Sequence, residues 1–537
     1  VDGFGLHAHI LDEYLGKTGD GVEAVDAAGF PIAPATLMIT IDCGIADVEP
    51  VRVLSARSNE PGRKPLDIII TDHHLPGPVL PAAYAIVNPK RADCEYPEKM
   101  LCGSGVAYKI VCALVSRMDA AAEMESKPGV FPAGYTKWLL DLVGIATMSD
   151  MVPLRGENRL LAYYGLMVLR KTRRPGILSL CRTNMLEPKN IVEDDIAFTI
   201  APRINVASRL AHPRMAFDLL TATSFDGAMR IAKDLNNINN RRKTMVAQIM
   251  KQAHAKVRES KLDQNPVLVI GNPDWKPPVL GLVATQLIKA YGRPTFVWGR
   301  DDSGAYKGSA RSTPDIDIVQ LMYTVPDEVF INKGGHAQSG GFCVHPDHIF
   351  DFDNAMQAAF AKIYGTKTEH GIDVEAEGDN VSNELGRNVQ VSSTQGKACH
   401  LVDAIISVSD INPRTFAMIE KLSPYGVGNE KPLFAITDFH IKNARLFGKT
   451  GEHLELEHGD WDNGQVKAIQ FFYTEGSLKK ANEKADEKSS EIASLDDLKQ
   501  DPLLALKQNT HKAIIGCIEK NQFRGANEIR LRIVDIV

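Results

Sequence analysis

Residues 66–74 read L-D-I-I-I-T-D-H-H, an unbroken apolar run that ends in an aspartate and two adjacent histidines. A continuous run of branched aliphatic residues predicts a buried strand of a parallel sheet that is covered on both faces. Similar runs lie on either side of it, T-L-M-I-T-I-D at 36–42 and A-Y-A-I-V-N at 83–88. Helical patterns follow at 103–118 and 136–148. This order predicts a doubly wound α/β domain, in which ligands bind at the carboxyl ends of the strands.

The composition limits the class of protein. The chain has 537 residues, of which 61 are basic and 67 acidic, so the net charge is −6. This length predicts three or four domains. The apolar runs are far shorter than the roughly 20 residues of a membrane span, and the first residues lack the pattern of a secretion signal. The eight cysteines form no C-x-x-C pair, which disfavours structural zinc and a disulfide framework. We therefore expect a cytoplasmic protein that does not bind membranes.

Three further segments follow the first domain. A polar stretch with few helix breakers predicts a long connecting helix. The runs P-V-L-V-I-G (266–271) and P-T-F-V-W-G (294–299) predict a second α/β domain, and short strand-like runs after residue 432 predict a small β-barrel. The expected boundaries are 1–222 for the first domain, 223–262 for the helix, 263–365 for the second domain and 366–537 for the barrel, with a charged insertion near 475–510.

Acidic and imidazole side chains gather at the ends of predicted elements in the first domain. Asp42 and Asp72 end two of the strands, His73 and His74 follow directly, and Asp150 ends the small-residue helix V-G-I-A-T-M-S-D. Each of them alone is explained equally well as a helix cap, a turn residue or a loop residue. Together they favour a hard divalent metal such as Mn²⁺ or Mg²⁺, because carboxylate and imidazole are ligands of such ions.

The motifs T-I-D-C-G-I, T-D-H-H and T-M-S-D-M-V-P-L, in this order, resemble the DHH phosphoesterase superfamily. Within it, the chain is similar to the RecJ family of single-strand-specific 5′→3′ exonucleases. The resemblance covers essentially the whole chain and implies a DHH domain, a long connecting helix, a DHH-associated domain and an oligonucleotide-binding (OB-type) barrel. The motifs that carry it are A-P-R-I-N-V-A-S-R-L (201–210), K-G-S-A-R-S (307–312), G-G-H-A-Q-S-G-G-F (334–342), P-Y-G-V-G-N-E-K-P-L-F (424–434) and N-Q-F-R-G-A-N-E-I-R-L-R-I-V-D (521–535).

The resemblance also implies roles for single residues. Asp42, His73 and Asp150 would bind two divalent cations, Mn²⁺ or Mg²⁺. His74 would face the scissile phosphate as a catalytic residue, and Asp72 would support it in catalysis. Gly334 and Gly335 would expose backbone N–H groups to an anion, and the forked guanidinium of Arg311 suits phosphate oxygens. We favour this explanation over a tight turn at the glycines and a surface ion pair at Arg311. The residues implied to bind phosphate are Arg203, Asn205, Arg209, Ser309, Arg311, Gly334, Gly335 and His336.

The implied activity is the metal-dependent hydrolysis of single-stranded DNA from its 5′ end to mononucleotides, in DNA repair and recombination. The implied partners are a single-strand-binding protein and a helicase, and the implied state is a monomer. In the barrel, the candidates for base stacking are Phe471, Phe472, Tyr473 and Phe523. Two alternatives stay open: a DHH phosphodiesterase acting on short oligonucleotides, and a non-catalytic DNA-binding scaffold.

Two departures from the family pattern bear on these expectations. The aspartate-rich D-Y-D-x-D-G motif is not found in the chain, and D-G-F-G-L (2–6) resembles the segment that follows that motif. We expect the missing strand to precede Val1 in the full protein, with true loss of the motif as the alternative. The chain 1–537 should then bind metal weakly and cut poorly. Ser208 stands where the family usually has glycine.

Overall fold

The computed structural model divides into two compact units. The first comprises Val1–Asp150 and Tyr164–Glu377, and the second comprises Met151–Tyr163 and Gly378–Val537. The residues that the structure describes are 6, 35–60, 64–124, 129–365, 389–392, 399–448, 451, 453–460, 464–471, 511–521 and 528–536. The charged insertion expected near 475–510 lies entirely outside them, as do residues 2–5 of the D-G-F-G-L segment. No helix within these ranges is both long and apolar enough to cross a membrane.

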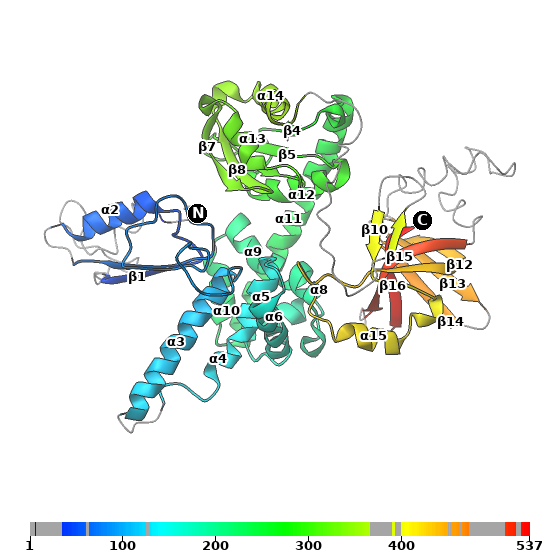
Figure 1. The fold of residues 1–537 in the computed structure, drawn as a ribbon, viewed down its shortest axis with the longest axis horizontal. Coiled ribbons are helices and arrows are strands. Elements are labelled where there is room, and N and C mark those ends of the chain that lie inside the picture. Colours follow the sequence, from blue (N-terminus) through cyan, green and yellow to red (C-terminus); the bar gives the residue numbers. More distant parts are fainter. Residues whose placement is uncertain are drawn as a thin grey trace. The chain divides into compact units, whose positions relative to one another are not determined.

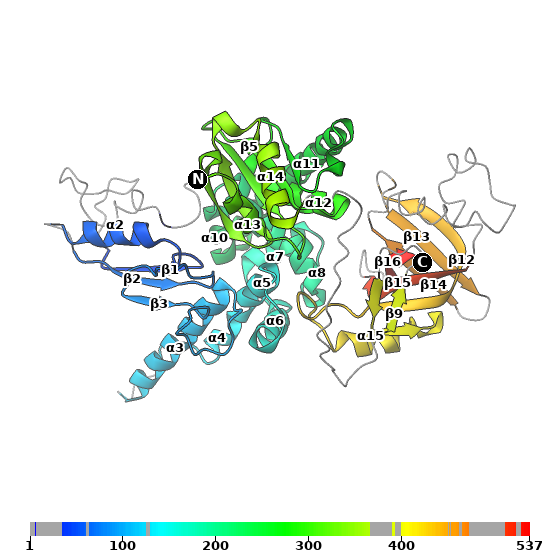
Figure 2. The ribbon, with the colours of Figure 1, turned by 45° about the horizontal axis from the view of Figure 1, so that its top comes forward.

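A parallel sheet opens the first unit. Its strands are β1 (Leu37–Ile41), β2 (Asp67–Thr71) and β3 (Ala85–Val87), in the order β1-β2-β3, and helix α2 (Val48–Ser58) connects the first two. Figure 2 shows α2 lying along one face of this sheet, where Val51 and Leu54 pack with Ile68 and Ile70 of β2. The β-α-β order that the apolar runs predict is therefore present.

Strand β1 is less buried than its apolar run predicts. Leu37, Ile39 and Ile41 are 51%, 52% and 58% exposed, whereas Thr40 between them is buried. Among the described strands β1 pairs only with β2 and lies at the edge of the sheet. Because successive residues of a strand point to opposite faces, the alternate residues of β1 point away from α2. The prediction of a fully buried strand at 36–42 is wrong for this reason.

Helices follow the sheet. They are α3 (Gly103–Met124), α4 (Tyr135–Trp138), α5 (Leu140–Ser149), α6 (Gly156–Leu169), α7 (Pro175–Thr183), α8 (Glu193–Asp195), α9 (Ala201–Leu210), α10 (Arg214–Thr221) and the long α11 (Phe225–Glu259), with a 3₁₀-helix at Pro188–Asn190 and a π-helix at Ile196–Ile200. Helix α11 confirms the predicted connecting helix. Ser224 caps it by accepting a hydrogen bond from the Gly227 N–H, at 3.3 Å. Its buried stripe includes Leu235, Ile249 and Ala253, as the helical spacing predicts.

The second sheet of the first unit has the strand order β4-β5-β6-β8-β7, with β4 and β5 parallel and the other neighbours antiparallel. Helices α11 and α12 pack against one face, and α13 and α14 enclose a core with Phe296, Phe342 and Phe352. The elements are β4 (Leu268–Gly271), α12 (Leu280–Tyr291), β5 (Thr295–Arg300), β6 (Tyr306–Arg311), α13 (Ile318–Thr324), β7 (Phe330–His336), β8 (Ser339–Val344) and α14 (Phe352–Tyr364), with short turns at Leu262–Gln264, Pro277–Val279, Asp327–Val329 and Pro346–His348.

The second unit contains a closed β-barrel (Figure 1). Strand β12 pairs with both β13 and β15, which closes the order β12-β13-β14-β16-β15 into a ring around Leu456, Ile514 and Leu531. The segment 151–163 belongs to this unit, since Leu154 N–H donates to the Val427 carbonyl at 2.7 Å. The elements are β9 (Val389–Ser392), β10 (Cys399–Val402), β11 (Ala404–Ile406), a turn at Val408–Asp410, α15 (Pro413–Glu420), β12 (Phe434–Phe447), β13 (His453–Asp460), β14 (Gly464–Gln470), β15 (His511–Asn521) and β16 (Glu528–Ile536).

Candidate metal centre and phosphate-binding residues

The carboxyl ends of the three parallel strands carry the polar residues of the site. The strand register aligns the last residues of β1, β2 and β3 with one another. The residues that come next are Asp42, Asp72 and Asn88, so all three lie at the same edge of the sheet. The backbone continues the pairing there, because Asp42 N–H donates to the Thr71 carbonyl at 2.9 Å. The edge expected to bind a ligand is therefore lined by polar side chains.

Asp72 organises the two histidines. Its side chain is 1% exposed and accepts hydrogen bonds from the backbone N–H groups of Ile45 (3.0 Å), His73 (2.7 Å) and His74 (3.1 Å). It also accepts from Nδ1 of His74, at 2.7 Å. Burial raises the pKa of the Asp72 carboxyl, but the four hydrogen bonds outweigh this and lower its pKa to about 2. Because the Asp72 carboxylate already accepts four hydrogen bonds, its role is to position the turn that carries His73 and His74 rather than to contact a substrate.

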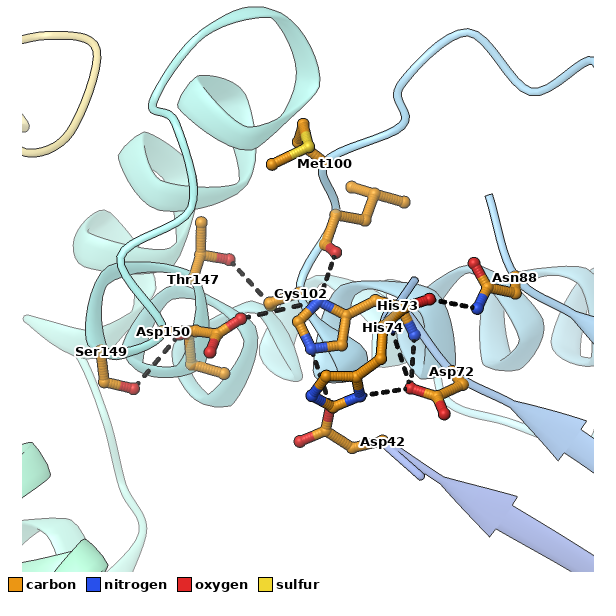
Figure 3. A network of polar contacts seen from close by, with 12 residues as sticks. Asp42, Asp72, His73, His74, Asn88, Met100, Cys102, Thr147, Ser149 and Asp150 are labelled. Carbon is orange, nitrogen blue, oxygen red and sulfur yellow. Dashed lines mark hydrogen bonds and ion pairs between the residues drawn. The ribbon is translucent and has the colours of Figure 1, made fainter. Parts of the chain in front are cut away.

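His73 lies at the centre of the site (Figure 3). Its Nδ1 is 3.0 Å from the Leu101 carbonyl oxygen, which can only accept, so we assign the ring proton to Nδ1. The lone pair on Nε2 then faces Asp42 Oδ1 at 3.1 Å. Asp150 lies on the other side, with Oδ2 3.7 Å from Nδ1. At 3.1 Å, the lone pair of His73 Nε2 and the Asp42 carboxylate oxygen repel each other unless a cation binds both.

The backbone of Asp42 has an uncommon conformation, which places its side chain. Its backbone φ is +64°, in the left-handed region that non-glycine residues rarely adopt. The carboxylate lies against Gly103, the first residue of α3, where a Cβ would come within 2.1 Å of Asp42 Oδ1. The partial positive charge at a helix N-terminus favours a carboxylate at this place. Strain of this kind is typical of functional sites.

The donor set fits a divalent cation. Ligand atoms of Asp42, His73 and His74 all lie within 4.8 Å of one another. Burial raises the pKa of Asp150, and the charge of Asp42 adds to this although His73 opposes it. The carboxylates of Asp42 and Asp150 and the lone pair of His73 are all electron-rich, and a cation bound between them would remove the repulsion among them. His74 is 46% exposed, and its bond to Asp72 raises its pKa, with burial opposing the shift.

The two motifs of the second sheet are brought together by strand pairing. Strand β8 lies between β6 and β7, and Ser309 of β6 and Gly334 of β7 both pair with Gly341. The residues two positions further along β6 and β7 share a partner in the same way. The predicted phosphate-binding residues of these strands thus lie at the same level of the sheet, on the two strands that flank β8: Ser309, Arg311, Gly334, Gly335 and His336.

Arg311 and Ser309 reach the first turn of α12. A Cβ on Gly281, the second residue of that helix, would lie 2.9 Å from Arg311 Nη2 and 3.5 Å from Ser309 Oγ. Burial lowers the pKa of Arg311, and the nearby charge of Arg209 lowers it further. Helix N-terminus, hydroxyl and guanidinium together form an environment that favours an anion.

The predicted residues of α9 divide into one buried and two more accessible side chains. Arg203 is 8% exposed, and it donates from Nε to Asn236 Oδ1 at 3.0 Å and from Nη1 to the Thr199 carbonyl at 2.8 Å. Asn205 and Arg209 are exposed. Arg203 is therefore anchored to α11 through Asn236, whereas the other two face solvent.

Three residues of the metal centre were not found from the sequence. Asn88 donates from Nδ2 to the His74 carbonyl at 2.9 Å, and its place after the third apolar run was a usable signal. Leu101 acts through its carbonyl and Gly103 through its missing Cβ. A sequence cannot indicate either role, because every residue has a backbone carbonyl and glycine occurs in many structural settings.

In the barrel, Phe471 is the one predicted stacking residue that the structure describes, and Phe472, Tyr473 and Phe523 lie outside the described residues. The guanidinium carbons of Arg530 and Arg532 lie 5.7 and 5.6 Å from the centre of the Phe471 ring. This pairing of an aromatic face with basic groups suits a nucleic-acid strand.

Comparison with known proteins agrees with this architecture. The DHH family N-terminal domain matches residues 6–147, the DHHA1 domain matches 264–362, and the RecJ OB domain matches 402–535. The fold and the carboxylate–histidine centre thus define a protein of the DHH class. The single-stranded-DNA-specific exonuclease RecJ of Salmonella typhimurium (strain LT2) is 32% identical over 464 residues, which are 85% of this chain and 70% of that protein. The chain belongs to the RecJ family.

Two further relatives show how much of the family's length is present. The single-stranded-DNA-specific exonuclease RecJ of Bacillus subtilis (strain 168) is 31% identical over 460 residues, 86% of this chain and 51% of that protein. The crystal structure of RecJ in complex with Mn²⁺ from Thermus thermophilus has the same fold, with a TM-score of 0.65 and 23% identity over 94% of this chain and 62% of that one. The chain therefore spans about half to two thirds of the length of these two relatives.

Proposed function

We propose that the protein is a metal-dependent exonuclease that degrades single-stranded DNA from its 5′ end to mononucleotides, in DNA repair and recombination. The observation that carries this proposal is the meeting of Asp42, His73 and His74, with ligand atoms within 4.8 Å of one another and Asp150 alongside. Membership of a family whose relatives are named single-stranded-DNA-specific exonucleases supports the same substrate.

Asp42, His73 and Asp150 would hold two divalent cations, Mn²⁺ or Mg²⁺. When bound, these cations supply Lewis-acid stabilisation of the phosphodiester and make water a stronger nucleophile at neutral pH. The Leu101 carbonyl keeps the proton of His73 on Nδ1, so that Nε2 is available as a ligand.

His74 would act on the phosphate. Asp72 holds its Nδ1 at 2.7 Å, which fixes the ring and leaves Nε2 as the other polar atom. Because the pKa of His74 is raised, Nε2 carries a proton over a wider pH range. It would donate that proton in a hydrogen bond to a non-bridging oxygen as negative charge develops there. Asp72 is then a positioning residue.

The other domains would select the strand and its direction. Ser309, Arg311 and the Gly334–His336 segment would bind the 5′-terminal phosphate, and the barrel would hold the strand through base stacking on Phe471. We assign 1–222 to the DHH domain, 223–262 to the connecting helix, 263–365 to the DHH-associated domain and 366–537 to the barrel domain. A cytoplasmic monomer that works with a single-strand-binding protein and a helicase fits this role.

The test offers three 5′-labelled substrates in Mn²⁺ to the protein with its natural N-terminal extension: single strand, duplex and dinucleotide. Stepwise loss from the 5′ end of the single strand alone is expected. His74→Ala should slow it by about 10²-fold or more, whereas the exposed His345→Ala in the second domain should not slow it. Tight binding without cleavage would support the scaffold alternative. Cleavage of the dinucleotide alone would support a phosphodiesterase of short oligonucleotides.

A further inference from the structure

The chain leaves the metal centre through a short segment of restricted backbone. The first unit breaks off at Asp150, and Met151–Tyr163 belongs to the second unit. Met151 has a φ of +58°, a conformation that non-glycine residues keep only where the surrounding structure imposes it. The ring of Pro153 fixes its own φ, and Leu154 is 2% exposed. Few of the backbone torsions between Asp150 and Leu154 are therefore free to vary.

This segment is bonded to residues 422–430 of the second unit, which we call the 422–430 turn. Three hydrogen bonds run from the segment to backbone carbonyls of the turn: Leu154 N–H to Val427 at 2.7 Å, Arg155 Nε to Gly428 at 3.1 Å, and Arg159 Nη2 to Leu422 at 2.7 Å. The packing is close as well, since a Cβ on Gly426 would lie 2.9 Å from Leu154 Cδ1. The chain is thus fixed to the turn at the fourth residue after Asp150.

The 422–430 turn is itself held by internal hydrogen bonds. Gly426 N–H donates to the Asn429 carbonyl at 3.0 Å, and Asn429 N–H donates to the Gly426 carbonyl at 3.1 Å. The side-chain Nδ2 of Asn429 donates to the carbonyls of Leu422 (3.0 Å) and Pro424 (2.8 Å). The turn includes most of the P-Y-G-V-G-N-E-K-P-L-F motif, to which the proposed function gives no role. Four hydrogen bonds within so short a stretch make it a firm support for the segment bonded to it.

Asp150 needs a support of this kind. It follows the last residue of α5, and the C-terminal end of a helix carries a partial negative charge that disfavours a carboxylate. Helix ends also fray. Helix α5 by itself therefore does not hold the Asp150 carboxylate at the place where its Oδ2 is 3.7 Å from His73 Nδ1.

We propose that the 422–430 turn is a positioning element of the metal centre, which holds Asp150 in place by fixing the segment that follows it. The inference rests on the proposed function, because that function makes Asp150 a metal ligand. The second unit, which contains the barrel, then supports a metal ligand of the first unit through the chain itself. Metal affinity depends in consequence on residues that do not bind the metal: Leu154, Arg155, Gly426 and Gly428.

The first experiment is a calorimetric titration of Mn²⁺ into the protein with its natural N-terminal extension. Gly428 has a φ of +74°, and an added Cβ would lie 3.2 Å from Arg155 Nε and 3.4 Å from Pro153 Cβ. Gly428→Ala should therefore disturb the segment and lower Mn²⁺ affinity about tenfold, as loss of a supporting partner does. The matched control is Gly451→Ala in the same unit, with a φ of +70° and an ordinary contact of 3.9 Å to Leu446 Cβ. It should change Mn²⁺ affinity less than about twofold, and equal effects of the two variants would overturn the proposal.

A second variant loosens the segment without adding an atom. Arg155→Ala removes the hydrogen bond to the Gly428 carbonyl, and the exposed position of Arg155 leaves the core of the unit intact. Mn²⁺ affinity should fall about two- to tenfold, the net value of one hydrogen bond. Arg293→Ala is the control, because it also removes a bond from an arginine to a backbone carbonyl, that of Asn265. Arg293→Ala should leave Mn²⁺ affinity unchanged, and an equal loss for both variants would contradict the inference.

Strand binding in EDTA separates positioning from a merely structural role. Gly428→Ala should bind a 5′-phosphorylated single strand within about twofold of the unchanged protein, so that turnover falls while KM stays the same. Weaker strand binding with unchanged Mn²⁺ affinity would show that the turn only supports the barrel, and the proposal would fail.

Asp150→Asn separates this inference from the proposed function. Should the protein cut no DNA while Asp150→Asn and Gly428→Ala both weaken Mn²⁺ binding, the positioning role stands and the proposed function fails. Should it cut DNA while Asp150→Asn weakens Mn²⁺ binding and Gly428→Ala does not, the positioning role is refuted and the function stands.

Discussion

Gly103→Ala should displace Asp42 from the metal centre. Gly103 begins α3, and a Cβ there would lie 2.1 Å from Oδ1, 2.4 Å from Cγ and 2.6 Å from Cβ of Asp42. Carbon and oxygen atoms in contact need more than about 3 Å, and Asp42 Cβ is among the clashing atoms, so the backbone of Asp42 or of the start of α3 would have to shift together with the carboxylate. The backbone of Asp42 is already at φ +64°, which limits how the residue can adapt.

The magnitude follows from the role of the displaced carboxylate. Loss of a well-placed partner at a metal centre lowers affinity about 10- to 100-fold, which is about 1.4 to 2.8 kcal/mol. A displacement of about 1 Å in a catalytic group lowers turnover by about 10²-fold. The helix itself should not lose stability, because alanine is favoured over glycine in helices by about 0.5–1 kcal/mol.

The assay is Mn²⁺ titration by calorimetry, with single-strand degradation measured in parallel. Gly105→Ala is the control, two residues along the same helix. Its added Cβ would meet Leu101 Cβ at 3.5 Å and Cys102 Sγ at 3.6 Å, which are ordinary contacts. Gly105→Ala should therefore bind Mn²⁺ as the unchanged protein does. If Gly103→Ala also binds Mn²⁺ with unchanged affinity, the placement of Asp42 against α3 is wrong.

Three further predictions concern the same unit. The pKa of Asp72 is about 2 against an ordinary 3.8, so its carboxylate stabilises the fold above pH 3.8 and loses this effect as pH falls towards 2. Asp72→Asn should flatten the pH dependence of the unfolding free energy in that window by about 2 kcal/mol, and an unchanged slope in urea titrations would contradict this. His74→Ala should lower turnover by about 10²-fold or more while Mn²⁺ affinity changes less than tenfold, and the reverse pattern would make His74 a metal ligand instead. Asp141 is buried and pairs with Arg174 Nε at 2.7 Å, so Asp141→Ala should cost about 3 kcal/mol in chemical denaturation, and a cost below about 1 kcal/mol would show that the pair contributes little.

The strands that carry the metal centre could be predicted because their signal is local. An apolar run that ends in a polar residue marks both a strand and its functional end, and the runs ending in Asp42 and Asp72 were found in this way. The third run ends in Asn88, which obeys the same rule. The burial of β1 could not be predicted, because an edge strand and a central strand have the same apolar residues.

In the barrel, too, some strands could be predicted from the sequence and others could not. Its apolar strands β12, β14, β15 and β16 were expected at about the right places, but β13 was not. The sequence of β13, H-L-E-L-E-H-G-D, alternates apolar and charged residues, which is the pattern of a half-buried strand and was a usable signal. It becomes a strand because β12 and β14 pair with it on either side. Both pairings are between consecutive strands, whereas the pairing of β12 with β15 joins Phe434 to Gly516, and no local pattern contains that closure of the barrel.

The sequence by itself determined the order of the domains, the strand ends and the residue types of the metal centre, because periodicity and motif spacing are properties of neighbouring residues. Only the tertiary structure decided which backbone groups hold His73 and why Gly103 must lack a side chain. Only the packing of α9 against α11 brought Arg203 and Asn236 together. Electrostatic and hydrogen-bonding energies depend on distances in space, and those distances arise when the elements pack.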